Sequence, residues 1–166
     1  MSTHKRPLSS PILPGESRDA RPNIGILLRG PYQEIVRRIA DELAEAGFDD
    51  IRPAHTAVFQ HIKADGSRLS ELAQRAQLTK QSMGYLVDYL EERGYVERRP
   101  DPTDRRASLI LLTERGWEQV RAALRIIAGI EDEWAQWLGT GRMEELRKML
   151  ADLDDAMKQL ASGRRQ

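Results

Sequence analysis

Cysteine is missing from all 166 residues of this chain. Its absence excludes disulfide bonds, thiol-based redox sensing and zinc sites with cysteine ligands within the chain. No apolar run approaches the roughly 18 residues that a membrane-spanning helix needs. The apolar residues near the N-terminus are interrupted by proline, unlike those of a secretory signal. We therefore expect a cytoplasmic protein that does not enter a membrane.

An excess of charge of either sign is also missing. Lys and Arg number 26, Asp and Glu number 26, and the formal net charge is zero. A strongly basic balance would have pointed to nucleic acid, so any nucleic-acid site must come from local clustering of basic side chains. Hydrophobic residues make up 40 % of the chain, which is enough for a folded core.

The residues of an active site are not apparent either. We find no nucleophile with a base and an orienting group, no glycine-rich phosphate loop and no metal-ligand spacing. His55 and His61 are six residues apart, which does not suit a metal pair on one helix face, so structural roles are expected. Trp117 and Trp134 fall on an apolar helix face and are expected in the core. The sequence predicts no enzyme, no cofactor and no metal.

The beginning of the chain differs in composition from the rest. Residues 1–23 combine four prolines with serines and mixed charges, which is typical of a flexible arm. An arm that contacts DNA or wraps around a partner is the alternative. From Ile24 onward, apolar residues recur at helical spacing, and Gly30-Pro31 either interrupts this helix or starts its main part.

The remaining elements follow from periodicity and from capping residues. We expect, in order, a helix over 53–63, a turn over 64–67, a short helix ending near 76, a helix capped by Thr79 and ended by Gly94, strands over 95–98 and 108–112, a helix capped by Thr113 and broken at 139–141, and a last helix to 160. This order predicts a mainly α fold with a small β-hairpin wing, a winged helix-turn-helix. Ala73 is small enough for two helices to cross closely. Gln77 occupies a turn position where glycine is common.

The helix after Thr79 offers a polar face. Its N-terminal end is short and rich in hydrogen-bonding groups, which suits the major groove of DNA. An ordinary solvated helix surface is the alternative. The residues expected on this face are Thr79, Lys80, Gln81, Ser82, Tyr85 and Tyr89.

The stretch "RRPDPTDRRASLILLT" (98–113) surrounds a proline-containing turn with two pairs of arginines. Guanidinium groups at an exposed hairpin tip suit the narrow, electronegative minor groove. Asp104 is placed to hold one guanidinium by a bidentate pair and so to aim it. Surface salt bridges worth about 0–1 kcal/mol each are the alternative.

Three segments resemble the MarR family of transcription regulators. "DPTDRRASLILLTERG" (101–116) resembles the family's wing and the start of the next helix, and "LVDYLEERGYVERR" (86–99) resembles the end of the recognition helix with the first wing strand. "SELAQRAQLTKQSMGYLVDYL" (70–90) is similar to the family's helix-turn-helix. The resemblance spans about residues 30 to 160 in element order.

The resemblance implies a homodimeric, sequence-specific regulator, usually a repressor, bound to a pseudo-palindromic duplex operator and responsive to a small aromatic or phenolic effector. It implies a first dimerisation helix over 24–50, a DNA-binding lobe over 51–112 and dimerisation helices over 113–166. The implied DNA-binding residues are Thr79, Lys80, Gln81, Ser82, Tyr85, Arg98, Asp104, Arg105 and Arg106. Many members have arginine where this chain has Tyr85 or Tyr89.

Two alternatives remain beside this interpretation. The apolar stripe from Met143 to Leu160 is coiled-coil-like and favours a dimer, but it would also serve to close the core of a monomer. The acidic residues Asp88, Glu91 and Glu92, near the recognition helix of a chain with no net charge, motivate a winged-helix module that binds a protein instead of DNA.

Overall fold

The computed structural model describes residues 22–163, without the side chains of residues 105 and 161–163. The arm expected over 1–23 therefore lies almost wholly outside the described residues. The chain forms two compact units, 1–34 and 35–166, which divide within the first helix. The division into an arm, a first helix, a DNA-binding lobe and C-terminal helices stays a prediction.

Helix α1 (Ile24–Glu45) runs through Gly30-Pro31 without a break. The expectation that this pair interrupts or starts the helix was wrong. Asn23 accepts a hydrogen bond from the Ile26 N–H at 3.1 Å, so the capping group stands about two turns earlier than the proline suggested. Pro31 removes one hydrogen bond from the helix, and the surrounding residues hold the helical path.

The other helices are close to those expected. A 3-10 turn over Pro53–His55 leads into α2 (Thr56–His61), and the later helices are α3 (Leu69–Arg75), α4 (Lys80–Glu92), α5 (Glu114–Leu138) and α6 (Thr140–Gly163). Thr79 and Thr113 each accept a backbone N–H as N-caps. Gly94 at φ +72° and Gly139 at φ +87° follow the ends of α4 and α5.

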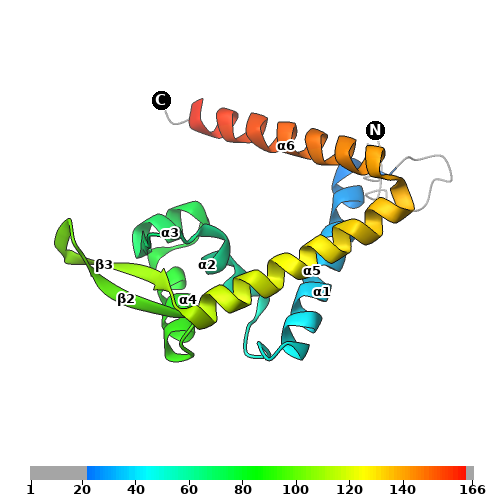
Figure 1. Cartoon of the computed structure of the whole chain (residues 1–166). Coiled ribbons are helices and arrows are strands. Elements are labelled where there is room, and N and C mark those ends of the chain that lie inside the picture. Colours follow the sequence, from blue (N-terminus) through cyan, green and yellow to red (C-terminus); the bar gives the residue numbers. More distant parts are fainter. Residues whose placement is uncertain (1–21, 164–166) are drawn as a thin grey trace, which may run out of the picture. The chain divides into compact units, whose positions relative to one another are not determined.

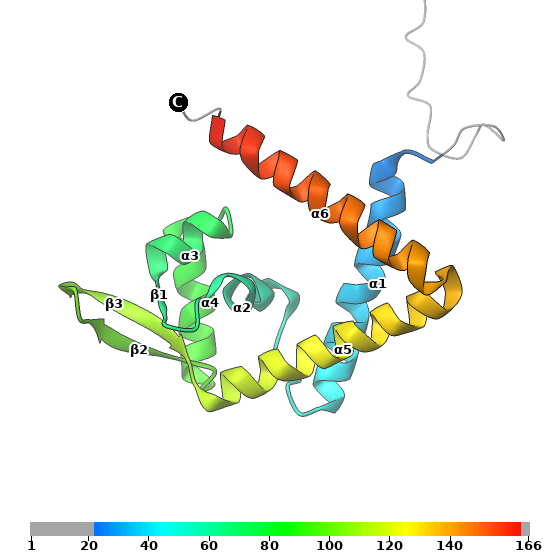
Figure 2. The ribbon, with the colours of Figure 1, turned by 45° about the horizontal axis from the view of Figure 1, so that its top comes forward.

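The wing is a three-stranded antiparallel sheet rather than a hairpin alone, in the order β1-β3-β2. The missed strand is β1 (Ser67–Arg68), which pairs with Ile110 and Leu109 (Figure 2). Two residues are too few for a periodic signal. The preceding turn depends on Gly66, whose φ of +93° and close approach to the Ile110 carbonyl leave little space for a side chain.

The two long strands also extend further than expected. They are β2 (Val96–Asp101) and β3 (Asp104–Leu112), so the predicted nine-residue loop is a turn with only Pro102 and Thr103 at its tip (Figure 1). The charged ends of these strands have no apolar alternation, which is why sequence pattern missed them. Pro100 is tolerated because β2 lies at the sheet edge, where a missing N–H breaks few bonds.

One buried core joins the helix-turn-helix to the wing. Leu72, Met83, Val87, Leu90 and Tyr95 are completely buried, and Ile110 reaches them from β3. Because α3, α4 and both long strands contribute to this core, α4 and the wing share one rigid support.

Helices α5 and α6 leave apolar side chains uncovered. Leu124 on α5 is 60 % exposed, and Met149 and Met157 on α6 are 62 % and 54 % exposed. Trp117 and Trp134, which were expected in the core, are only half-buried and do not belong to the buried core cluster.

Candidate nucleic-acid interface

The turn between α3 and α4 is built on Gln77. Its φ of +55° is the left-handed conformation that this position requires, and the Leu78 N–H bonds to the Ala73 carbonyl at 2.9 Å. Ala73 is 4 % exposed beside the fully buried Leu72 and Met83. The small side chain thus allows α3 and α4 to cross closely, as expected from the sequence.

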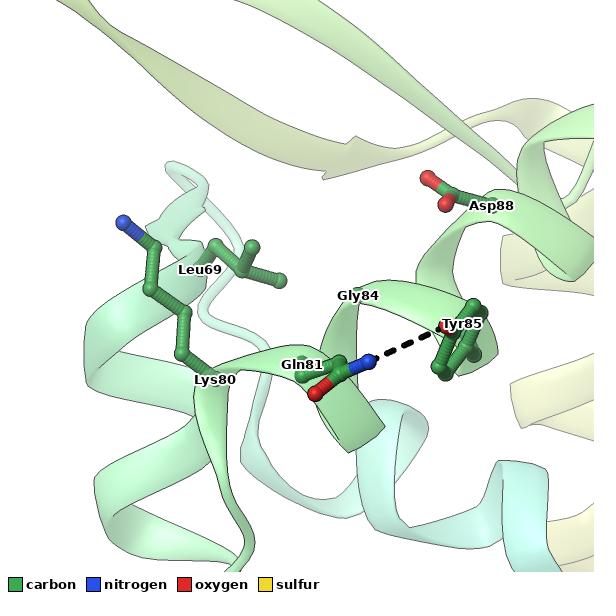
Figure 3. Close-up of a pocket in the computed structure, with 6 residues that line it drawn as sticks. All are labelled: Leu69, Lys80, Gln81, Gly84, Tyr85 and Asp88. Atoms are coloured by element: carbon green, nitrogen blue, oxygen red, sulfur yellow. Dashed lines mark hydrogen bonds between the residues drawn. The ribbon is translucent and has the colours of Figure 1, made fainter.

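The first turn of α4 presents its polar groups to solvent. Thr79 Oγ1 accepts the Ser82 N–H at 3.0 Å and donates to Ser82 Oγ at 2.8 Å. Gln81 Nε2 donates to the Tyr85 hydroxyl at 3.1 Å, and Tyr85 is 65 % exposed (Figure 3). Lys80 is exposed, and no ion pair to it is found among the described residues. Side chains on this turn are therefore available for hydrogen bonds to bases and phosphates.

Tyr89 does not belong to the solvent face where the sequence placed it. Its hydroxyl donates to the Asp50 carbonyl at 2.7 Å. Its ring stacks on His55 at 4.2 Å between centroids, and the Arg93 guanidinium lies 3.4 Å from the ring centroid. The position turns inward because the loop before α2 packs against the last turns of α4, a contact that helical periodicity does not reveal.

His55 has the structural role expected for it. It is 5 % exposed, and its Nδ1 accepts the Arg52 N–H at 3.0 Å. Burial lowers the pKa of His55 below 6.5, and the positive charge of Arg93 lowers it further. The imidazole is thereby favoured in its neutral form, as the acceptor role of Nδ1 requires.

The wing is anchored by Asp101, which sequence reasoning did not single out. The Asp101 side chain is 4 % exposed and accepts the Thr103 hydroxyl at 2.7 Å and N–H at 2.8 Å. Arg68 of β1 donates to the same carboxylate through Nε at 2.7 Å. The bonds from Thr103, together with Arg68, lower the pKa of Asp101 to about 2. The signal available in the sequence was Asp-Pro-Thr, a turn in which the aspartate bonds forward.

Asp104 contacts the main chain of the wing. Its Oδ1 accepts the backbone N–H of Arg106 at 3.0 Å, and its expected pairing with a guanidinium stays a prediction. The carboxylate therefore shapes the main chain at the start of β3. Arg106 is exposed, and its guanidinium forms no ion pair within the described part of the chain. The backbone of Arg105 lies in β3, and its side chain is outside the described residues.

Arg98 faces the recognition helix. Its Nη2 is 2.5 Å from Asp88 Oδ1, its Nη1 pairs with Glu91, and its N–H donates to Glu91 Oε1 at 3.1 Å. Arg98 thus joins β2 to the C-terminal half of α4. The arrangement neutralises two of the three acidic residues that suggested a protein-binding surface.

Within residues 22–163, no helix combines the length and the apolar character needed to cross a membrane. The same residues contain no group of three or more His, Asp or Glu side chains placed to hold a metal ion.

Comparison with known proteins identifies relatives of this chain. Residues 49–107 match the model of the MarR family. The uncharacterized HTH-type transcriptional regulator YdcH of Bacillus subtilis (strain 168) is 31% identical over 109 residues, which are 64% of this chain and 74% of YdcH. The comparisons point to a transcriptional regulator rather than an enzyme.

Solved structures share the fold. The transcriptional repressor CouR, bound to a 23-mer DNA duplex, is 25% identical and superposes with a TM-score of 0.64 over 80% of this chain and 92% of CouR. Apo wild-type MarR from E. coli superposes with a TM-score of 0.65 at 23% identity, over 81% and 98% of the two chains. The predicted mainly α, winged helix-turn-helix fold is confirmed.

Proposed function

Because this chain belongs to the MarR family of DNA-binding transcriptional regulators, we propose that it is a cytoplasmic homodimer that binds a pseudo-palindromic operator. We further propose that it is a repressor whose DNA binding responds to a small aromatic or phenolic effector.

The observation that carries this proposal is the shared support of α4 and the wing. The first turn of α4 offers Lys80 and Gln81 to solvent, and β3 offers Arg106. Both elements are attached to one buried core. A rigid pair of this kind suits simultaneous contact with a major groove and an adjacent minor groove.

Each remaining site residue has its own part in the proposal. Thr79, Ser82 and Tyr85 contact bases or phosphates from α4, and Arg105 reaches DNA beside Arg106. Asp104 shapes the main chain that carries these arginines, and Arg98 holds the wing against α4. A direct contact of Arg98 with DNA stays a prediction. Its guanidinium already pairs with the carboxylates of Asp88 and Glu91 and would have to leave them to reach DNA.

Exposed apolar side chains support the dimer. Met149, Leu153, Met157 and Leu160 of α6 are between 47 % and 66 % exposed. An apolar stripe of this length is costly to leave in water, and a second chain would cover it. A two-fold dimer would present two recognition helices to half-sites about one DNA turn apart.

The effector part of the proposal rests on the resemblance to the MarR family.

Selection from random duplex DNA with the purified protein at about 0.15 M salt tests the proposal, because ionic strength governs phosphate contacts. The expected result is an enriched pseudo-palindrome with half-sites one turn apart. Weak binding without enrichment, lost as salt rises, would contradict the proposal and favour a protein-binding module.

A further inference from the structure

The recognition helix carries an apolar hollow on its otherwise polar face. Its apolar lining consists of Leu69 at the start of α3 and of Gly84 and the Tyr85 ring on α4 (Figure 3). Lys80, Gln81 and Asp88 complete the lining of this space, whose volume is about 440 Å³. Phosphate contacts need no apolar lining, so this hollow suits a different group of the DNA.

Gly84 keeps this hollow open. Glycine inside a helix is less favourable than alanine. An ideal Cβ at this position would lie 3.9 Å from the nearest atom outside its own helix, Leu69 Cδ2, which is ordinary van der Waals contact. Neither helix packing nor backbone conformation therefore demands glycine here. The consequence of the missing side chain is open space beside Leu69.

Side chains of both charges line the hollow, so the charges alone do not select a phosphate. Lys80 and Asp88 belong to the lining, and the pairing of Asp88 with Arg98 holds that carboxylate in place. The bond from Gln81 to the Tyr85 hydroxyl holds the ring as a wall.

Among the groups that base pairs display in the major groove of unmodified DNA, the C5 methyl of thymine is the apolar one. Resting on the DNA binding proposed above, we propose that Leu69, Gly84 and the Tyr85 ring bind a thymine methyl in each half-site. Leu69 and Gly84 are then specificity-determining residues that the family resemblance did not indicate.

The test removes the methyl alone. Once selection has supplied an operator, each thymine is replaced singly by deoxyuridine, and affinity is measured with the full-length protein. Replacement of the contacted thymine should weaken binding roughly four-fold in one half-site and roughly 15-fold in both, as expected for loss of one buried methyl each. If the protein binds an operator tightly and every single replacement changes the affinity by less than about two-fold, the inference is overturned. Failure to obtain any operator contradicts the proposed function instead.

Protein variants test whether the loss of affinity on thymine replacement depends on the hollow. Leu69→Ala removes one wall, and Gly84→Leu fills the space without removing a core side chain. Both should bring the ratio of thymine to uracil affinities close to one, with folding checked by thermal unfolding. Arg106→Ala, on the wing and outside the lining of the hollow, is the matched control, because it should weaken both operators equally and leave the ratio unchanged. If both hollow variants keep the wild-type ratio of thymine to uracil affinities, the inference is also overturned.

Discussion

Arg68 and Asp101 are 33 residues apart in the sequence, and Arg68 Nη2 lies 2.6 Å from Asp101 Oδ2. Arg68 immediately precedes α3, and Asp101 stands at the turn of the wing. The pair therefore joins the first helix of the helix-turn-helix to the tip of the hairpin. Thr103 adds a bond from its hydroxyl and one from its N–H to the same carboxylate.

Asp101→Asn should destabilise the protein at neutral pH, and the loss should depend on pH. The pKa of Asp101 is lowered from 3.8 to about 2, so the folded state holds this proton less tightly than the unfolded state. The stabilisation is complete above about pH 4 and is lost as pH falls toward about 2. Denaturant unfolding at a series of pH values should show wild type and variant converging over this window. A constant difference between the two would contradict the assignment.

His55 should make the wild type less stable in mild acid. Its pKa is below 6.5 in the folded state because of burial and of Arg93, so the unfolded state binds the proton more readily. Stability is complete above about pH 6.5 and falls as pH decreases below that value. His55→Phe retains a ring to stack on Tyr89 and should lack this component. Parallel melting curves between about pH 5 and 7.5 measure it, and equal slopes for both proteins would refute the prediction.

Arg106→Ala should weaken operator binding while leaving folding intact. Its guanidinium is exposed and has no ion pair among the described residues, so the native fold loses little. We expect a loss of about 1–3 kcal/mol in binding free energy, typical of a specific arginine contact. Fluorescence anisotropy at about 0.15 M salt measures the affinity.

Arg121→Ala is the matched control for that experiment. It removes the same charge from α5, where Arg121 is 50 % exposed and paired with Glu114. Its affinity should remain near that of the wild type. Equal losses in both variants would show that net charge, not the wing contact, governs binding.

Gly116→Ala should be destabilising by about 1–3 kcal/mol, the usual cost of overpacking. A Cβ on Gly116 would lie 2.1 Å from the Tyr95 carbonyl oxygen, so α5 would have to move away from Tyr95, the residue before β2. Gly129→Ala is the control within the same helix, because no atom lies within 4 Å of its Cβ position. Thermal unfolding should separate the two variants, with Gly129→Ala neutral or slightly stabilised.

Leu153→Glu should convert the proposed dimer to monomers. Leu153 is 47 % exposed on the apolar stripe of α6, and a buried carboxylate there would be strongly unfavourable. Light scattering should give the wild type twice the chain mass of 18.9 kDa and the variant a single chain. Lys148→Glu, on the exposed surface of the same helix, is the control and should stay dimeric. A monomeric wild type would contradict the dimer itself.

Local signals determined most of the helices in advance. Thr79 and Thr113 were recognisable as caps because a short hydroxyl side chain satisfies free N–H groups at a helix start. Gly94 was recognisable as the end of α4 because it adopts a positive φ easily. The winged helix-turn-helix could be predicted from these local capping signals and from helical periodicity. Strand β1 did not, since two residues carry no period.

The sequence by itself determined the order of the elements, the polar first turn of α4 and the position of the exposed arginine at 106. Only the tertiary structure decided the partners. In the folded protein the Tyr89 hydroxyl donates to the Asp50 carbonyl. Arg98 pairs with Asp88 and Glu91, and Arg68 pairs with Asp101. The physical reason is that capping and periodicity act over about four residues, whereas these contacts join elements that only folding brings together.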